Sequence, residues 1–231
     1  MATSSTAPAL GIRDEVAALK RERTIAAAVE LFYERGYENT TLDSVAEWLG
    51  VTKPFIYAHF GAKSELLAEI CSRGIASALR AMDSVLALDL SPTDRLAELS
   101  RRFVTAVLES QKHIAIFSRE EKNLLPADFQ RISAMRRDFD RKLSALLESG
   151  VKAGEFQVPD PRITALAIGG MVSWAYVWYR ARGRLDLPDL AEEMSRLVLA
   201  MVHAAPAAKA ATPRKSGARA ATTAKRSGRA R

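Results

Sequence analysis

Hydrophobic residues recur at intervals of three and four from residue 12 to residue 203, the spacing that places them on one face of a helix. The alternating β-branched runs and hairpin turns that would indicate strands do not occur. The first predicted helix runs from about Ile12 to Arg35 and ends at Gly36. The pattern therefore predicts an all-α protein of about nine helices.

Capping residues and prolines mark several later helix boundaries. The segment Ser91-Pro92-Thr93-Asp94 supplies an N-cap, a proline at the first helical position and a carboxylate in the first turn. Two more helices are predicted to begin at Asp160-Pro161 and at Leu187-Pro188, and Gly150 and Gly154 are expected to end the long helix before them.

The longest uncharged run extends over 17 residues, from Ile163 to Tyr179. This is the lower limit of a membrane-spanning helix, but the run contains two glycines, a serine and several aromatic residues. A buried or interfacial helix is the better interpretation, and we expect no membrane partner.

Composition excludes several classes of protein. With 48% hydrophobic residues the chain of 231 residues can form a substantial core. The single cysteine, Cys71, forms no internal disulfide, and three scattered histidines indicate no metal site. Nucleophile-elbow, phosphate-loop and dinucleotide-binding motifs do not occur, so we expect no enzymatic activity and no cofactor. No signal peptide is recognisable, which favours a cytoplasmic location.

The formal charge of +7 is unevenly distributed. Residues 1–70 carry seven basic and ten acidic side chains, whereas residues 204–231 carry eight basic and no acidic ones. This last segment contains no aliphatic side chain larger than alanine, which predicts a disordered Ala/Lys/Arg-rich tail. We also expect a disordered arm over residues 1–11. The charge excess thus belongs to the tail, and net charge alone identifies no partner.

Residues 40–60 have the spacing of a helix-turn-helix. Thr40 or Thr41 can cap a first helix over 42–49, and Thr52 can cap a second helix over 53–59. The packing positions are a small residue where the helices approach, a glycine at the turn and a branched residue that packs back: Ala46, Gly50 and Ile56. Two short helices around a glycine also fit a plain helical hairpin, so spacing alone leaves both interpretations open.

The segment TLDSVAEWLGVTKPFIYAHFGAKSELL, preceded by LFYERGYENTT, closely resembles the DNA-binding signature of the TetR/AcrR family of transcriptional regulators. The resemblance implies a helix-turn-helix DNA-binding domain over 12–62 and a helical effector-binding and dimerisation domain over 63–203. It also implies a sequence-specific repressor that is released from DNA by a small-molecule effector.

The same resemblance implies the DNA contacts. Thr41 and Lys63 are expected to bind phosphates, and Tyr57 to contact the backbone or a thymine methyl group. Lys20, Arg21, Arg23, Lys53 and Lys63 are expected at or near the DNA side, whereas most of the acidic residues are expected to point elsewhere: Glu30, Glu34, Glu38, Asp43, Glu47 and Glu69. The full set of predicted contacts comprises Thr41, Thr52, Lys53, Pro54, Phe55, Tyr57, His59 and Lys63. Because Pro54 and Phe55 depart from many relatives, the operator sequence does not follow from the family.

Apolar stripes on the last two long helices predict a homodimer with a four-helix interface, which suits a palindromic double-stranded DNA operator. The expected interface residues are Gly170, Met171, Leu190, Met194, Leu197 and Met201. A buried core within one chain is the alternative interpretation of these stripes.

The block WAYVWYRARGRLDLPDLAEEM is similar to the end of TetR-family regulators of fatty-acid and steroid breakdown, which respond to acyl-CoA thioesters. The implied effector is an acyl-CoA or another lipophilic small molecule. The predicted pocket residues are Phe103, Phe117, Phe139, Arg141, Trp174 and Trp178. A different class of function, a nucleoid-associated protein that binds DNA non-specifically through the basic tail, remains an alternative.

Overall fold

The computed structural model describes residues 11–203, and this part of the chain is entirely helical apart from turns and loops. Its helices are α1 (Ile12–Arg35), α2 (Leu42–Leu49), α3 (Lys53–Tyr57), α4 (Lys63–Leu86), α5 (Pro92–Glu109), α6 (Gln111–Glu120), the 3₁₀ helix η1 (Glu121–Asn123), α7 (Pro126–Lys152), α8 (Pro161–Ser173), α9 (Ala175–Trp178) and α10 (Leu187–His203). The all-α prediction is confirmed. The run predicted as one apolar helix divides at Trp174 into α8 and the four-residue α9. The predicted basic tail and all but the last residue of the N-terminal arm lie outside the described residues.

Helix boundaries follow the capping signals of the sequence. Gly36 ends α1 with a φ of 82°, which favours glycine. The Ser91 hydroxyl accepts the Asp94 N–H at the start of α5, and the Asp160 carboxylate accepts two N–H groups at the start of α8. The long helix α7 continues through Gly150 and ends before Gly154. The Phe156 ring packs directly on Gly150, where a side chain would clash with it. Gly150 is therefore a close-packing position rather than the predicted helix end.

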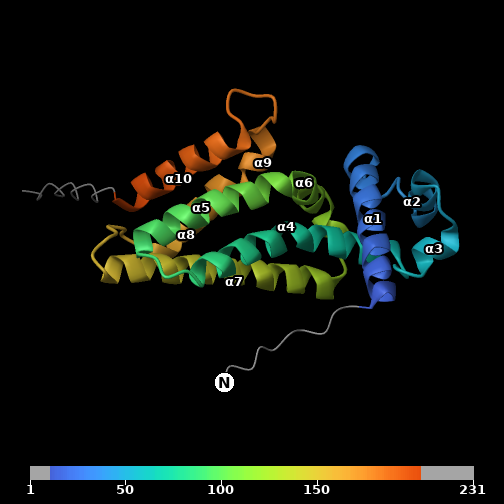
Figure 1. Ribbon diagram of the computed structural model, residues 1–231, viewed down its shortest axis with the longest axis horizontal. Helices are drawn as coiled ribbons and strands as arrows, with labels where there is room; N and C mark the ends of the chain where they lie inside the picture. Colours follow the sequence, from blue (N-terminus) through green and yellow to red (C-terminus); the bar gives the residue numbers. More distant parts are fainter. Residues whose placement is uncertain (1–10, 204–231) are drawn as a thin grey trace, which may run out of the picture.

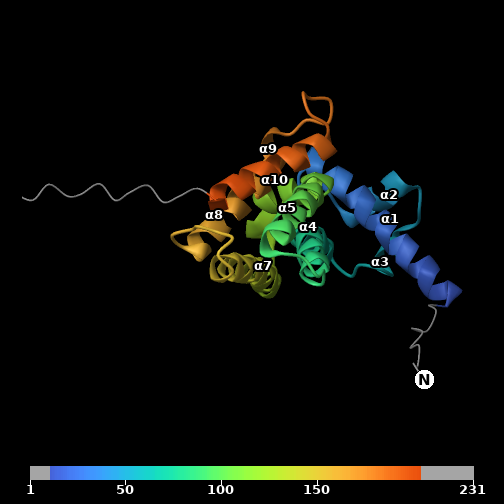
Figure 2. The ribbon, with the colours of Figure 1, turned by 60° about the vertical axis from the view of Figure 1, so that its left-hand side comes forward.

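The helices form an elongated molecule (Figure 1). Helix α1 lies across one end, with α2 and α3 on its outer side and the bundle α4–α10 on its inner side. Within the bundle, α5 contacts α4, α7, α8, α9 and α10, and the turned view in Figure 2 shows it among these helices. In the described residues, no helix combines the length and hydropathy needed to cross a membrane.

Two hydrophobic clusters meet along α4. The first half of α4, up to Cys71, packs with α1, α2 and α3, while Ala78, Met82 and Val85 in its second half pack with α5, α7, α8 and α10. Ile116 and Ile132, from α6 and α7, also belong to the first cluster. Because α4 and α6 contribute to both clusters, displacement of either helix changes the packing beneath the helix-turn-helix. The boundary predicted at residue 62 stays a prediction.

Candidate nucleic-acid interface and ligand cavity

The turn between α2 and α3 has the geometry of a helix-turn-helix. Gly50 lies in the left-handed region at φ 64° and ψ 33°, and the Val51 N–H donates to the Ala46 carbonyl at 3.0 Å. Ala46 and Ile56 are both buried, as their predicted packing roles require. The turn therefore holds α3 against α2 and leaves the opposite face of α3 in solvent.

Thr41 caps α2. Its hydroxyl accepts the Ser44 N–H at 3.0 Å, and the Ser44 hydroxyl accepts the Thr41 N–H at 3.0 Å. Thr40, the other candidate cap, is instead buried and donates to the Gly36 carbonyl at 2.9 Å. Thr52 precedes α3 but forms no side-chain cap, so the prediction that it caps this helix is wrong. The exposed hydroxyls of Thr41 and Thr52 both lie where α2 and α3 begin.

The outward face of α3 consists of Lys53, Pro54 and Tyr57, all exposed. Phe55 is half-buried against the core of this domain, and its ring meets the His59 ring edge-on at 5.5 Å between centroids. Helix α3 ends at Tyr57, two residues earlier than predicted, so His59 lies beyond the helix and is half-buried. Phe55 and His59 are consequently less available to DNA than the sequence suggested.

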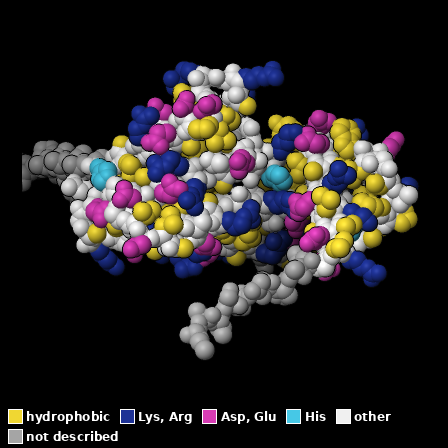
Figure 3. All heavy atoms as spheres, viewed as in Figure 1, with side chains coloured by type: hydrophobic (Ala, Val, Ile, Leu, Met, Phe, Trp, Pro, Cys, Tyr) yellow, Lys and Arg dark blue, Asp and Glu magenta, His cyan; other side chains and the backbone are white. Residues whose placement is uncertain are grey.

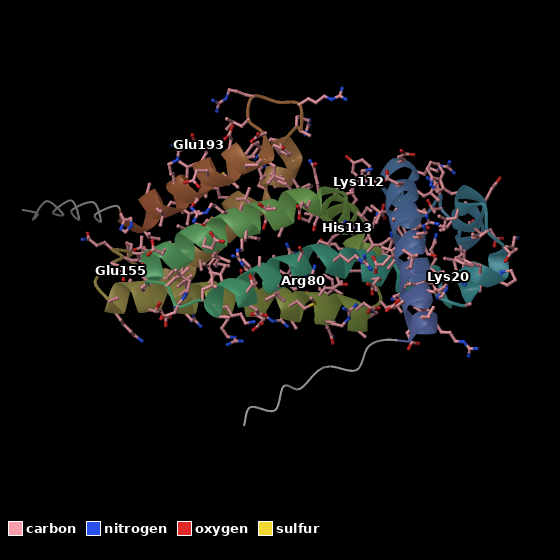
Figure 4. All side chains as sticks on the ribbon, in the orientation of Figure 1. Lys20, Arg80, Lys112, His113, Glu155 and Glu193 are labelled. Carbon is pink, nitrogen blue, oxygen red and sulfur yellow. The ribbon has the colours of Figure 1, made fainter. Side chains whose placement is uncertain are left out.

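Several cations expected on the DNA side are engaged within the domain. The Lys53 ammonium lies 2.5 Å from the Asp43 carboxylate, and this hydrogen bond raises the pKa of Lys53. The expectation that Asp43 points away from this face is wrong, because the turn at Gly50 packs α3 against α2 and brings Lys53 within reach of Asp43. The Lys63 ammonium donates to the Tyr37 carbonyl at 2.9 Å and lies 4.1 Å from the centre of the Tyr37 ring. Lys20, on the side of α1 toward α3, lies 5.4 Å from the centre of the Phe55 ring (Figure 4).

Helix α6 holds the end of α1 through charged groups. Arg119 donates to the Tyr33 carbonyl at 3.0 Å, and the Glu120 carboxylate accepts the Tyr37 N–H at 3.3 Å. Lys112 of α6 also forms an ion pair with Glu30 of α1. The contacts of Arg119 and Glu120 tie the end of α1 and the turn that precedes α2 to the last residues of α6.

Further polar contacts join α1 to α4, near the first residues of α6. Arg73 of α4 binds both carboxylate oxygens of Glu22 of α1, at 2.6 and 2.7 Å. Glu22, Arg73 and His113 line one crevice between α1, α4 and α6, and His113 lies beside Lys112 (Figure 4). Burial lowers the pKa of His113. Figure 3 shows basic and acidic side chains side by side where the bundle meets α1. The helix-turn-helix domain is therefore joined to the bundle both by these polar contacts and by a shared apolar core.

A cavity of about 240 Å³ lies among α4, α5, α6, α7 and α8. Phe103, Phe117 and Phe139, three of the predicted pocket residues, line it, and the rings of Phe103 and Phe139 are 4.5 Å apart between centroids. Cys71 is a further lining residue, and burial raises the pKa of its thiol to about 12, so the thiol stays neutral. The wall is predominantly apolar.

Arg136 and Asp140 are the charged residues of the cavity wall. The Arg136 guanidinium lies 4.9 Å from the centre of the Phe117 ring. Burial raises the pKa of Asp140, and the nearby Arg136 opposes that shift. This arrangement suits a ligand with an apolar body and one polar or anionic end.

Asp140→Asn is expected to raise the free energy of unfolding at neutral pH. The pKa of Asp140 is raised on folding, so the folded state favours the protonated carboxyl group. The stability that this group contributes is present below its ordinary pKa of 3.8 and is lost as pH rises through the shifted pKa, whereas asparagine stays neutral at every pH. The gain should therefore shrink as pH falls toward 3.8, which urea unfolding of both proteins across this pH range measures.

Asp138→Asn is the matched control on the same helix. A hydrogen bond from Lys142 and another from Arg141 lower the pKa of Asp138, so this change should destabilise the protein at neutral pH and lose its effect in acid. The same sign of change for Asp140→Asn and Asp138→Asn would contradict the assignment of Asp140 as a carboxylate whose ionisation opposes folding.

Three predicted pocket residues do not line this cavity. Arg141 is 74% exposed at its side chain and pairs with Asp138. The cavity-facing positions of α7 are Ile132, Arg136, Phe139 and Asp140, a helical spacing that places Arg141 to one side. Trp174 and Trp178 lie on the outer surface, and the cavity is lined from α8 by Gly169, Gly170 and Ser173 instead.

Sequence reasoning also missed several apolar lining residues. Ile75, Val107 and Ile114 complete the wall from α4, α5 and α6. Each belongs to an ordinary helical stripe, and nothing in a stripe separates core positions from cavity positions.

The outer face of α8, α9 and α10 carries large exposed apolar side chains: Ile163, Trp174, Val177, Trp178 and Leu197. Figure 3 shows hydrophobic side chains at the surface over α9 and α10, below the loop that joins them. Of the predicted interface residues, Gly170 and Leu197 are exposed and Met171 and Met201 are half-buried. Leu190 and Met194 are buried in the core of this chain and contribute little surface to an interface. They pack inward because that face of α10 lies on α5, where the Ser195 hydroxyl donates to the Ala97 carbonyl at 3.0 Å.

A helix-turn-helix with an exposed second helix, joined to a helical bundle with an apolar cavity, defines a DNA-binding transcriptional regulator. The chain belongs to the TetR family. The family profile described as "Bacterial regulatory proteins, tetR family" matches residues 25–70, and "Tetracyclin repressor-like, C-terminal domain" matches residues 89–202. Members of this family are regulators rather than enzymes.

Individual relatives agree with this assignment. The chain is 26% identical over 182 residues to the HTH-type transcriptional repressor KstR2 of Rhodococcus jostii (strain RHA1), covering 78% of this chain and 89% of KstR2. It is 28% identical to the solved structure of PfmR from Thermus thermophilus, with a TM-score of 0.70 over 77% of this chain and 97% of PfmR. AibR, solved in complex with isovaleryl coenzyme A and operator DNA, gives a TM-score of 0.66 over 79% of this chain and 97% of AibR. At 24% identity, the likeness to AibR concerns the fold alone.

Proposed function

We propose that the chain is a cytoplasmic, homodimeric repressor that binds a palindromic operator through the outward face of α3 and is released by a lipophilic small molecule. Two recognition helices related by a two-fold axis fit half-sites about one DNA turn apart. The exposed apolar face of α8–α10 supports the dimer, since unpartnered patches of this kind mark interaction sites in soluble proteins.

One observation carries the proposed coupling: α6 contacts both the cavity and the helix-turn-helix domain. Phe117 lines the cavity, and two and three residues later Arg119 and Glu120 bind the end of α1 and the turn before α2. A ligand that displaces the Phe117 ring therefore shifts the groups that position α2 and α3. A ligand changes the affinity for DNA only to the extent that it binds the DNA-competent and the DNA-incompetent positions of α2 and α3 with different affinity.

The chemistry of the cavity favours an acyl-CoA or a compact lipophilic compound with an anionic end. The apolar wall suits an acyl chain, and Arg136 offers a guanidinium to a phosphate or carboxylate. The volume of about 240 Å³ is small for a ligand site, so a short acyl chain fits better than a long one. The complex of AibR with isovaleryl coenzyme A makes short-chain thioesters a suitable first set of compounds.

A release assay tests this proposal. The full chain is bound to a fragment of genomic DNA that it selects. Release from this fragment is then compared for short- and long-chain acyl-CoAs, free coenzyme A and neutral lipophilic compounds. We expect short acyl-CoAs to release the protein and free coenzyme A to have little effect. Arg136→Gln should weaken release by acyl-CoAs by about tenfold, as for the loss of one charge-assisted hydrogen bond, and leave release by neutral compounds unchanged. Release that is insensitive both to chain length and to Arg136→Gln would contradict a ligand in this cavity.

A further inference from the structure

The DNA-reading face carries an ion pair that joins its two helices. Asp43 lies in the first turn of α2 and Lys53 is the first residue of α3, with the Lys53 ammonium 2.5 Å from Oδ2 of Asp43. The side chains are 65% and 44% exposed for Lys53 and Asp43, respectively. An exposed pair of this kind contributes little to folding stability, so its consequences are to be sought in DNA binding.

The pair leaves Lys53 only part of its hydrogen-bonding capacity. An ammonium has three N–H donors, and Asp43 takes one of them. The remaining donors can reach base-edge acceptors such as guanine O6 and N7 without breaking the pair. Held from one side, the ammonium also has fewer orientations to lose when it binds.

A phosphate meets a different situation, because the carboxylate of Asp43 repels it. The other oxygen of Asp43, Oδ1, is shielded from solvent and accepts no hydrogen bond from the described residues. If Lys53 left for a phosphate, the Asp43 carboxylate would lose its ion-pair partner next to the negatively charged backbone. The pair therefore disfavours binding that relies on phosphates alone.

We propose that Asp43 is a specificity-determining positioning residue, which holds Lys53 for a base edge and disfavours its use on phosphates. This inference rests on the proposed placement of α3 in the major groove. It assigns to an acidic residue of the reading face a role in rejecting non-cognate DNA, which is a form of specificity achieved by repulsion.

The test compares Asp43→Asn, Asp43→Glu, Lys53→Gln and the double variant Asp43→Asn/Lys53→Gln. Each full-length protein is titrated against two duplexes over a range of salt concentrations. One duplex is selected by the wild-type protein from a randomised library, and the other is a scrambled sequence of the same composition.

Asp43→Asn frees Lys53 without removing a hydrogen-bonding side chain. Its affinity for the scrambled duplex should rise, with a log–log salt slope steeper by about 0.9 per protomer as Lys53 engages a phosphate. Its preference for the selected duplex should fall by about tenfold, the scale of one base contact. Asp43→Glu should restore most of the preference. In the Lys53→Gln background, Asp43→Asn should no longer change the slope for the scrambled duplex.

The possible failures are distinguishable. If Lys53→Gln leaves both duplexes bound as in the wild type, Lys53 does not contact DNA, and both the placement of α3 and the role of Asp43 are overturned. If Lys53→Gln weakens binding to the selected duplex but Asp43→Asn leaves the preference and the slope unchanged, only the role of Asp43 is overturned. Thermal unfolding of every variant separates these outcomes from loss of structure.

Discussion

Tyr57→Ala is expected to lower operator affinity by about a hundredfold or more and to leave the thermal unfolding midpoint almost unchanged. Tyr57 is the last residue of α3 and is 51% exposed, so its truncation removes little buried surface. In a dimer the residue is lost from both half-sites, and losing one base-edge or backbone contact of about 1–3 kcal/mol twice gives this effect. Fluorescence anisotropy with an operator duplex and circular dichroism on heating measure the two quantities.

Trp48→Ala is the matched control for Tyr57→Ala. Trp48 is also a 51% exposed aromatic of the helix-turn-helix, but it lies at the end of α2 near Arg35 rather than on α3. Its removal should leave operator binding nearly intact. Tyr57→Phe separates a phosphate hydrogen bond from apolar contact, since only the former needs the hydroxyl. Retained binding in Tyr57→Ala, or equal losses in both alanine variants, would refute the proposed docking of α3.

Leu197→Glu is expected to convert the dimer to monomers and to weaken operator binding by about a hundredfold or more, as when one of two linked binding events is lost. Leu197 of α10 belongs to the exposed apolar face of α8–α10 and is 53% exposed, so the folded monomer accommodates the charge. In a two-fold interface a single change places two carboxylates against apolar surface. Analytical ultracentrifugation gives the mass in solution, and anisotropy gives the affinity for DNA.

Leu125→Glu controls for the introduced charge. Leu125 is another 53% exposed leucine, at the start of α7 and away from the outer face of α8–α10. This variant should remain dimeric and bind DNA as the wild type does. If Leu197→Glu stays dimeric while folded, the interface lies elsewhere on the molecule.

Local rules predicted much of the fold because they depend on residues close together in sequence. The caps Ser91 and Asp160, the stop at Gly36 and the left-handed turn at Gly50 each follow from the conformational preference of one residue and its neighbours. The helix-turn-helix was predictable for the same reason, as its defining residues span only a few turns of chain.

The partners of charged side chains were not predictable from the sequence. Asp43 was expected to point away from the DNA face, yet it lies against Lys53, ten residues on, because the Gly50 turn packs α3 against α2. Likewise the cavity takes Arg136 rather than Arg141, since the rotation of α7 depends on its packing against α4 and α8. Such rotations follow from long-range packing, which the periodicity of a single helix leaves undetermined.

The most direct test of the account is a hydroxyl-radical footprint of the full chain on a genomic fragment that it binds. A dimer that docks α3 in two major grooves predicts a two-fold symmetric pattern, with protected half-sites centred about 10 bp apart on a palindromic sequence. The pattern should disappear in Tyr57→Ala at the concentration that saturates the wild type. Uniform protection without a symmetric site, unchanged in Tyr57→Ala, would show that charge alone drives binding and would contradict the account.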